Sequence, residues 1–414
     1  MKFLLVILTV FSISVFSFVF KFDGWIEYDF DQPTDQTKYG VVVPFMGTTF
    51  IASGGFRRDN IVIPPYSDSL WNNYWYFDEG FFSYSNEFLE LEVGVKQHPV
   101  GPGEIYKLFV EEKGYSYPSI KSVGKIGRFR VETLWGGIRL DDGAKPAKAF
   151  NYRALVFSPI DGLEIAYEDS VLYLGRYFDP YYYFVPIPIP GIQEFFHLNA
   201  PWYSYLNDNS MIGGWIKYST ENWKTYFELL IDDINMNRFL APESYQNPDK
   251  IAFLVGFSGK SGPFRLTYEV AGATAYTFQR TVSNRPYEYV FFEGSNYPLE
   301  KNMIGYRHGE NNIVCAIRFE YDEKPWSFKV ELENVIHGTR TPDKPWHGGS
   351  MPSGTKWLIG EIDSKFSLKA RIAYTLEQLS NRLEKLVVGI RFGYINGKPL
   401  VGADLSFILD FSDL

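Results

Sequence analysis

Apolar and polar residues alternate over long stretches of the second half of the chain. Residues 264–278 read FRLTYEVAGATAYTF, and Phe264, Leu266 and Tyr268 fall on one face while Arg265 and Glu269 fall on the other. Residues 326–336 (WSFKVELENVI) and 365–376 (KFSLKARIAYTL) repeat this period of two. Because successive side chains of a strand point to opposite faces, these stretches predict strands with one apolar and one polar face.

The connections between these stretches differ in length. Short connections are predicted at residues 158–162, 219–222, 258–263, 321–325, 362–364 and 395–399. Longer, irregular segments cover residues 175–209, 233–250, 279–309 and 337–355. Strands of about 10 residues, joined by short turns on one side and long loops on the other, are typical of outer-membrane barrels. The first third is less regular, with strands predicted at residues 87–95, 104–112 and 126–134.

Composition separates a membrane barrel from a soluble sandwich, whose strands also alternate. Aromatic residues make up 18% of the 414 residues, with 30 Tyr and 36 Phe, yet the mean hydropathy is slightly polar at -0.17. Beyond the first residues no apolar run is long enough for a membrane-spanning helix. The sequence therefore predicts an all-β fold: a large transmembrane antiparallel β-barrel of the bacterial outer membrane, with long extracellular loops and roughly 14–18 strands, even in number.

The two ends of the sequence indicate export. Lys2 precedes an apolar run that small residues close near Ser17, which predicts a cleaved signal peptide over residues 1–17, with an uncleaved anchor as the alternative. Residues 18–414 are predicted to form a single barrel domain, and its less regular first part, residues 18–148, leaves a plug or periplasmic element open. The final stretch LVGADLSFILDF is similar to the signal read by the outer-membrane barrel assembly machinery. Outer-membrane lipids and this machinery are the expected general partners.

Charge and motifs argue against several functions. The formal net charge is -9, whereas nucleic-acid binders carry basic surfaces. The single cysteine, Cys315, excludes an intrachain disulfide. The sequence lacks the Gly-x-Ser-x-Gly, P-loop and His-Glu-x-x-His motifs, and its five histidines are scattered, so we expect no enzyme activity, no catalytic residues, no metal site and no cofactor.

Two groups of residues remain as candidate binding residues. The first is a set of charges on the predicted lumen-facing positions of the strands: Glu168, Glu228, Asp232, Arg265, Glu269, Arg318, Lys329, Arg371 and Arg391. Their mixed signs favour a hydrated wall with charges paired across strands over a ring selective for one ion sign. The second is the aromatic loop, residues 176–209, which either packs its own rings in the barrel mouth or offers them to sugars. Its candidate glycan contacts are Tyr181, Tyr182, Tyr183, Trp202, Tyr203 and Tyr205.

The pair Asp232–Asp233 closes the apolar run of ELLIDDI, residues 228–234. Neighbouring strand residues face opposite sides, so the two carboxylates are not expected to share a ligand unless a bulge interrupts the strand. Asp233 is expected to mark where the strand leaves the membrane. Asp232 and Glu228 then point toward the lumen.

Several segments resemble the Wzi-type capsule-assembly outer-membrane family. They are residues 151–182 (NYRALVFSPIDGLEIAYEDSVLYLGRYFDPYY), residues 207–234 (NDNSMIGGWIKYSTENWKTYFELLIDDI), and a hairpin from MIGYRHGENN at 303–312 to NVIHG at 334–338. The resemblance covers roughly half of the chain. It implies a non-enzymatic outer-membrane barrel that helps assemble, bind or anchor surface polysaccharide. A passive porin for small solutes is the alternative, and the sequence leaves the glycan and the oligomeric state open.

Overall fold

The computed structural model describes residues 19–29, 34–45, 48–59, 74–112, 116–196, 208–235, 237–279, 287–293, 297–339, 349–350, 356–377, 383–395 and 397–410. Side chains are described from Gly80 onward, with gaps near the chain ends and in some loops. Within these ranges the chain forms 18 strands: β1 (Val19–Asp29), β2 (Thr34–Phe45), β3 (Thr48–Asp59), β4 (Tyr74–Ser85), β5 (Leu89–Lys96), β6 (Tyr117–Ile126), β7 (Phe129–Arg139), β8 (Lys148–Ile160), β9 (Leu163–Leu174), β10 (Asn209–Ser219), β11 (Trp223–Asp233), β12 (Lys250–Ser261), β13 (Phe264–Ala273), β14 (Asn312–Glu323), β15 (Trp326–His337), β16 (Asp363–Glu377), β17 (Leu383–Ile395) and β18 (Lys398–Asp410).

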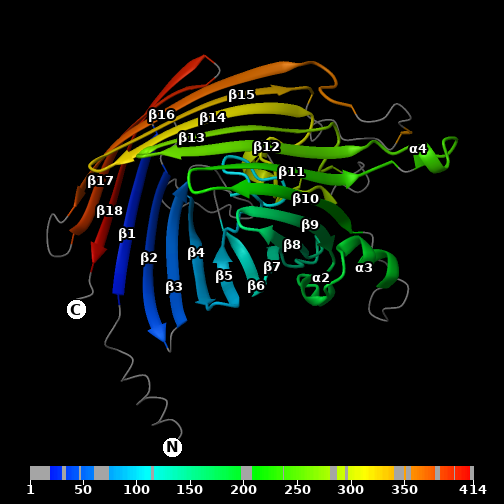
Figure 1. The fold of residues 1–414 in the computed structure, drawn as a ribbon, viewed down its shortest axis with the longest axis horizontal. Coiled ribbons are helices and arrows are strands. Elements are labelled where there is room, and N and C mark those ends of the chain that lie inside the picture. Colours follow the sequence, from blue (N-terminus) through cyan, green and yellow to red (C-terminus); the bar gives the residue numbers. More distant parts are fainter. Residues whose placement is uncertain are drawn as a thin grey trace, which may run out of the picture.

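The strands form one closed antiparallel barrel (Figure 1). Each strand pairs with the next in sequence, and β1 closes the ring against β18 in a register that runs from Lys21↔Asp410 to Asp29↔Gly402. Closure leaves no strand edge without a partner, which is what a hydrocarbon environment requires. The predicted fold class is therefore confirmed, and the 18 strands lie at the upper end of the expected range.

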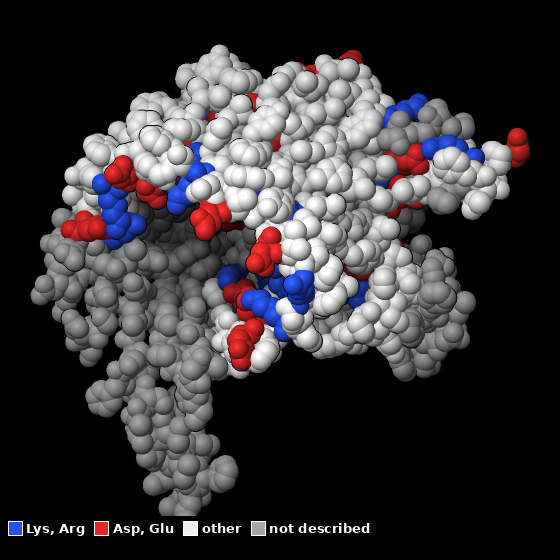
Figure 2. Space-filling model, viewed as in Figure 1, with Lys and Arg blue, Asp and Glu red and all other residues white. Residues whose placement is uncertain are grey.

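The alternation of residue types separates the two faces of the wall as predicted. On β13, Leu266 is 45% exposed on the outside, whereas Thr267 and Glu269 on the lumen side have no exposed surface. Trp326 and Phe328 on β15 are likewise exposed on the outer face. In the view of Figure 2 the outer surface over the upper strands is almost free of charge, and charged side chains border a hollow below it. Among the described residues no helix is long and apolar enough to cross a membrane.

Most short turns lie on one side of the barrel, and the long connections lie on the other side. Two of the predicted short turns differ from this arrangement. The predicted turn at 362–364 is the end of the long connection into β16, which starts at Asp363, and the short connection follows β16 at residues 378–382. The turn between β17 and β18 lies on the side of the long loops. The alternation in 365–376 identifies the strand, but it does not indicate at which end the chain turns.

Residues 18–148 contribute seven strands to the barrel, β1 to β7, and a segment that enters the lumen. This segment, residues 97–112 and here called the plug, includes the stretch 104–112 that was predicted from the sequence as a strand. That prediction is wrong, because the apolar side chains Ile105, Tyr106, Leu108, Phe109 and Val110 do not alternate, and all are buried in the lumen.

A second segment lies in the lumen beside the plug. Residues 287–293 and 297–311, here called the inner loop, contain the short helix α5 (Leu299–Asn302) and belong to the connection between β13 and β14. The backbone N–H of Glu111 in the plug donates to the carbonyl of Ile304 at 2.9 Å, and the N–H of Tyr306 donates to Leu108 at 3.2 Å. Together with lumen-facing wall residues, the two segments form the main apolar core.

The aromatic loop packs on the outside of the barrel. Its helices α2 (Pro180–Phe184) and α3 (Ile189–Phe196) lie beside β7, β8 and β9 (Figure 1). Tyr182 and Ile189 have no exposed surface and pack against outward-facing wall residues such as Trp135, Val171 and Tyr173. The expectation that this loop folds into the barrel mouth is therefore wrong for its described part.

Candidate functional site

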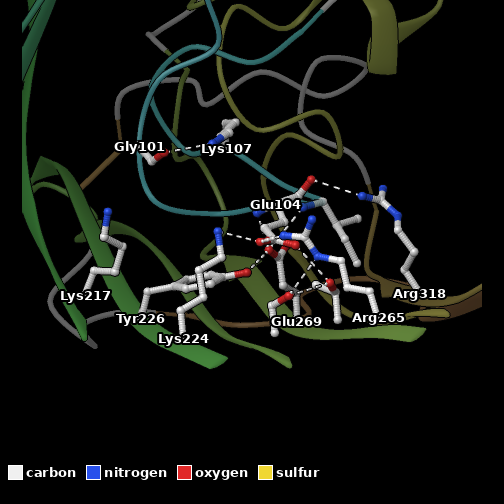
Figure 3. A network of polar contacts seen from close by, with 12 residues as sticks. Gly101, Glu104, Lys107, Lys217, Lys224, Tyr226, Arg265, Glu269 and Arg318 are labelled. Carbon is white, nitrogen blue, oxygen red and sulfur yellow. Dashed lines mark hydrogen bonds and ion pairs between the residues drawn. The ribbon is translucent and has the colours of Figure 1, made fainter. Parts of the chain in front are cut away.

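The tip of the plug, residues 101–106, contacts the lumen wall (Figure 3). The carboxylate of Glu269 on β13 accepts hydrogen bonds from three successive backbone N–H groups: Glu104 at 2.5 Å, Ile105 at 3.1 Å and Tyr106 at 2.8 Å. The hydroxyl of Tyr226 on β11 donates to the same carboxylate. One buried acid thus satisfies the donors of a tight turn that has no secondary structure of its own.

The side chain of Glu104 makes the reciprocal contact with the wall. It pairs with Lys224 on β11 and Arg265 on β13, each at 2.5 Å, and accepts a hydrogen bond from the Thr267 hydroxyl at 2.9 Å. Burial raises the pKa of Glu104, but the hydrogen bond and charge of Lys224 outweigh it, so this pKa lies below its usual value. Arg318 on β14 adds a hydrogen bond to the Glu104 carbonyl at 3.2 Å. Lys224 and Arg265 stand near the short-turn ends of their strands, so the tip of the plug lies toward the short-turn side of the barrel.

Two glycines allow the tip to approach the wall. Gly101 has a φ of +89°, and a Cβ there would lie 2.8 Å from an oxygen of Glu228. A Cβ on Gly103 would lie 2.1 Å from the carbonyl oxygen of Tyr106. The Lys107 ammonium donates to the Gly101 carbonyl at 2.7 Å, and burial lowers the pKa of Lys107. Glycine at both positions is therefore a requirement of the fold of the plug.

A second set of contacts holds the plug against the inner loop. Glu111 accepts the backbone N–H of Arg307 at 2.8 Å and pairs with its guanidinium, which also donates to the Ile105 carbonyl at 2.8 Å. The Tyr106 hydroxyl donates to Glu333 on β15 at 2.6 Å. Burial raises the pKa of Tyr106, so this hydroxyl stays a donor. The plug is thereby fixed at its tip and along its length.

The structure places the predicted lumen charges in three settings. Glu168, Glu228, Arg265, Glu269 and Arg318 lie where the plug meets the wall; Glu168 there accepts the hydroxyl of Tyr152 at 2.5 Å. Lys329, Arg371 and Arg391 line a separate cavity on β15, β16 and β17. Asp232 has its side chain buried at a β-bulge, which interrupts the register between Ile231 and Asp233.

At the bulge, the side chain of Asp232 contacts the connection that follows β13 and the neighbouring strand. Asp232 accepts the backbone N–H of Phe278 at 2.9 Å and lies 3.9 Å from the ammonium of Lys250. It therefore ties the end of β11 to the connection that follows β13. Groups of three or more His, Cys, Asp or Glu that would suit a metal ion are absent among the described residues.

The candidate glycan contacts are only partly described. Tyr182 has no exposed surface, and its hydroxyl donates to Asp208 at 2.7 Å; Tyr183 is 8% exposed. The expectation that these two rings present free faces to a sugar does not match their burial. Tyr181 is half-buried, and Trp202, Tyr203 and Tyr205 lie outside the described residues.

The aromatic loop also covers an ion pair on the outer face of the wall. Arg153 on β8 binds Asp169 on β9 through two contacts, at 3.0 and 2.8 Å, and donates to the carbonyls of Val185 and Ile187. Asp169 accepts the N–H of Ile189 at 2.8 Å. Charges on a lipid-facing wall are costly, and the loop supplies the hydrogen bonds that water would otherwise give them.

Sequence reasoning missed the plug residues Glu104, Lys107 and Glu111 and their wall partner Lys224. The charged face of β11 could have identified Lys224, since it alternates with the outward Trp223 and Thr225. The plug residues had no such signal. Two glycines, Gly101 and Gly103, followed by an apolar run without alternation, form a pattern that is typical of a segment buried on all sides.

Comparisons with solved structures show the fold alone. The E. coli protein Wzi, described as an outer membrane protein involved in group 1 capsule assembly and a carbohydrate-binding β-barrel, aligns with 98% of this chain and 87% of its own, at a TM-score of 0.59 and 11% identity. The outer membrane protein OpdK of Pseudomonas aeruginosa covers 95% of this chain and 98% of its own, at 0.51 and 10%. A doubly substituted form of OccD1 (OprD) gives 0.51 and 11%, with 95% of each chain covered.

Sequence comparison adds little. No protein-family profile matches the chain. Curated sequences named trigger factor, from Thermotoga petrophila and Thermotoga maritima, are 28% identical over 107 and 106 residues, which is 26% of this chain. The chain spans about a fifth of the length of these relatives. A match of this extent describes one segment and does not identify the protein.

Proposed function

We propose that this protein is a non-enzymatic outer-membrane barrel that binds surface polysaccharide and helps to assemble or anchor it. The observation that carries the proposal is the plug, which fills the lumen beside β8–β15 and is hydrogen-bonded to Glu269 near the middle of the wall. A lumen occupied on this side by the plug suits a binding protein better than a pore for free diffusion. The likeness in fold to Wzi, whose description includes carbohydrate binding, supports the same function.

The alternative is a passive porin for small solutes. It draws support from the cavity on β15, β16 and β17, where the plug does not reach the lining residues. The two functions differ in the ion current that the barrel allows.

The test combines conductance and binding on the full chain. The purified protein, reconstituted in a planar bilayer, is expected to pass little current and to bind polysaccharide extracted from the surface of its own bacterium. A variant in which a Gly-Ser linker replaces residues 101–107 should conduct more, which shows that the barrel inserts. A large, steady conductance of the unaltered protein without polysaccharide binding would establish the porin instead.

The aromatic loop is the second element that we propose to contact polysaccharide, through Tyr181 together with Trp202, Tyr203 and Tyr205. Replacement of these four residues by alanine should reduce polysaccharide retention. Deletion of the whole loop is a poorer test, because the loop also shields Arg153 and Asp169 on the outer wall. Unchanged retention by the fourfold variant would remove this loop from the proposed binding surface.

A further inference from the structure

We propose that a recess on the outer wall of the barrel, beside the aromatic loop, holds the end of an acyl chain of a membrane lipid. This recess, here called the outer recess, lies between the outer face of β7, β8 and β9 and residues 183–188 of the loop. The inference concerns the lipid side of the barrel, so it is independent of the polysaccharide function.

The floor of the outer recess is formed by three neighbouring strands. Val131 on β7 lies opposite Leu155 on β8, and Leu155 lies opposite Tyr167 on β9. These side chains alternate with lumen-facing neighbours and therefore point outward; Val131 is 49% exposed and Leu155 is 46% exposed. The floor is thus continuous with the apolar face that a membrane barrel turns toward lipid.

The aromatic loop bounds the outer recess on the side of the long connections. Two residues from Leu155 along β8, Arg153 donates to the loop carbonyls of Val185 and Ile187. These hydrogen bonds hold the stretch 183–188 against the wall, and the stretch contains two prolines, which restrict its backbone. The recess is therefore bounded by a loop segment that is fixed in place.

The charged groups at the edge of the outer recess are already bonded to each other and to the loop. Asp169 accepts two contacts from Arg153, at 3.0 and 2.8 Å, and the backbone N–H of Ile189 at 2.8 Å. The rest of the lining consists mainly of apolar side chains. A polar occupant would lose its own hydrogen bonds here without replacement, whereas a hydrocarbon chain has none to lose.

The outer recess has a volume of about 190 Å³. An apolar cavity of about 150 Å³ can hold a benzene ring and stays free of water. Whole small-molecule sites occupy about 300–1,000 Å³, so the outer recess suits part of a chain rather than an entire lipid. Unfilled space at this position would forfeit the dispersion contacts of the side chains around it.

The apolar floor continues toward the short turns. Phe129 and Phe157 lie two residues beyond Val131 and Leu155, and their rings stack with centroids 4.9 Å apart. Thr133, at the level of Arg153, follows Phe129 by four residues in β7. For a tilted strand this is roughly 10 Å along the barrel axis. The apolar band of such barrels is about 25 Å tall, so the outer recess lies near its middle.

This position identifies the lipid leaflet that supplies the chain. Acyl chains of the leaflet on the short-turn side end near the middle of the hydrocarbon layer. A chain that runs along Phe157 and Leu155 ends against residues 183–188, because the loop covers the wall beyond them (Figure 1). The headgroup of this lipid then lies at the short turns, and only the end of its chain enters the outer recess.

The test uses two photoreactive phosphatidylethanolamines, one with a diazirine at the end of an acyl chain and one with a diazirine close to the glycerol. The full chain is reconstituted in vesicles with either lipid, irradiated and mapped by peptide mass spectrometry. We expect the end-of-chain probe to label residues 183–188 several-fold more than residues 264–268 on the outer wall of β13. The probe close to the glycerol should leave residues 183–188 unlabelled.

Matched variants test whether the outer recess itself holds the chain. Leu155→Trp fills the recess and should reduce the labelling of residues 183–188 several-fold, whereas Leu155→Ala enlarges it and should keep or increase the labelling. Leu266→Trp on β13 is the control, because Leu266 is 45% exposed on the outer face, close to the 46% of Leu155. A change in electrophoretic mobility on heating checks that each variant is folded.

Three outcomes would overturn the inference. Equal labelling of residues 183–188 and 264–268, unaffected by Leu155→Trp, would show ordinary contact with lipid. Labelling of residues 183–188 by both probes alike would show that no chain end is fixed there. Absence of labelling, with dimers in native mass spectrometry that Leu155→Trp abolishes, would make the recess an interface between two copies of the chain. Each of these outcomes leaves the proposed function in place, because polysaccharide binding and conductance are measured separately.

Discussion

The carboxylate of Glu269 accepts a hydrogen bond of 2.8 Å from the backbone N–H of Tyr106, across 163 residues of sequence. This contact joins the barrel wall to the plug. It is supported by the N–H groups of Glu104 and Ile105 on the same carboxylate. This buried acid therefore contributes to the attachment of the tip, beside the contacts of Glu104 with Lys224 and Arg265.

Glu269→Gln is expected to loosen the plug without breaking the barrel. The amide keeps one acceptor oxygen but loses the charge, at a cost of about 2 kcal/mol in the attachment of the tip. Ion conductance in a planar bilayer should rise, and the segment 97–112 should become accessible to protease. Glu164→Gln is the matched control, because Glu164 pairs with Lys217 and Arg130 on the wall. Equal conductance of the two variants would show that Glu269 does not hold the plug.

Gly101→Ala is expected to displace the tip. Its φ of +89° is unfavourable for alanine by about 1–3 kcal/mol, and the added Cβ would lie 2.8 Å from an oxygen of Glu228. Gly124→Ala on β6 is the control, since a Cβ there has nothing within 4 Å. Only Gly101→Ala should increase conductance and lower the thermal midpoint. A midpoint equal to that of Gly124→Ala would contradict the tight packing at Gly101.

The sequence predicted the wall far better than the contents of the lumen. Alternation placed Glu269 on the lumen side and Leu266 outside, because a strand pairs locally and its faces repeat every two residues. The plug could not be predicted in this way, since Glu104 meets Lys224 and Arg265 through a fold of a loop that has no periodicity. The alignment of Lys329, Arg371 and Arg391 across β15, β16 and β17 could not be predicted for a related reason: these residues come from separate strands, and register depends on turn positions.

For the aromatic loop, the sequence predicted the packing of the rings but not the surface on which they pack. Its composition predicted packed aromatic rings, and Tyr182 is buried as that interpretation required. The surface on which it packs was predicted wrongly, because nothing in the loop sequence distinguishes the barrel mouth from the outer wall. The partner residues Trp135 and Val171 lie on outward faces that alternation alone assigns to lipid.

His98 is expected to make the barrel sensitive to mild acid. Burial lowers its pKa to about 3, and the charges of Lys121 and Lys96 act in the same direction, although Glu92 lies 3.4 Å from its Nδ1. The unfolded chain takes up this proton near pH 6.5, and the folded chain only near pH 3, so the contribution of His98 to stability falls as the pH drops through this window. Above about pH 6.5 the contribution is complete.

The variant His98→Gln should remove this dependence while keeping a partner for the hydroxyl of Ser119, which lies 2.9 Å from the Nε2 of His98. Between about pH 6.5 and pH 5 the native protein should lose about 2 kcal/mol more of its unfolding free energy than the variant does. Urea titrations at both pH values measure the difference. Parallel losses in the two proteins would show that His98 is not buried as a neutral side chain.

Arg153 and Asp169 are expected to behave as a buried ion pair, although they lie on the outer face of the barrel. Replacing either residue alone by alanine leaves an uncompensated charge under the aromatic loop and should cost about 3–5 kcal/mol. The double variant Arg153→Met, Asp169→Leu should recover much of this loss, because no charge then remains to be solvated. Unfolding midpoints in urea, with the protease sensitivity of the aromatic loop, measure both effects.

The exposed pair of Lys125 and Glu90 provides the comparison for this experiment. Both side chains are 44% exposed, so alanine at either position should change the unfolding free energy by about 0–1 kcal/mol. If single substitutions at Arg153 and Asp169 cost no more than those at Lys125 and Glu90, the loop does not seal the outer ion pair. A large loss that the double variant fails to recover would show that Arg153 acts mainly by holding the loop carbonyls of Val185 and Ile187.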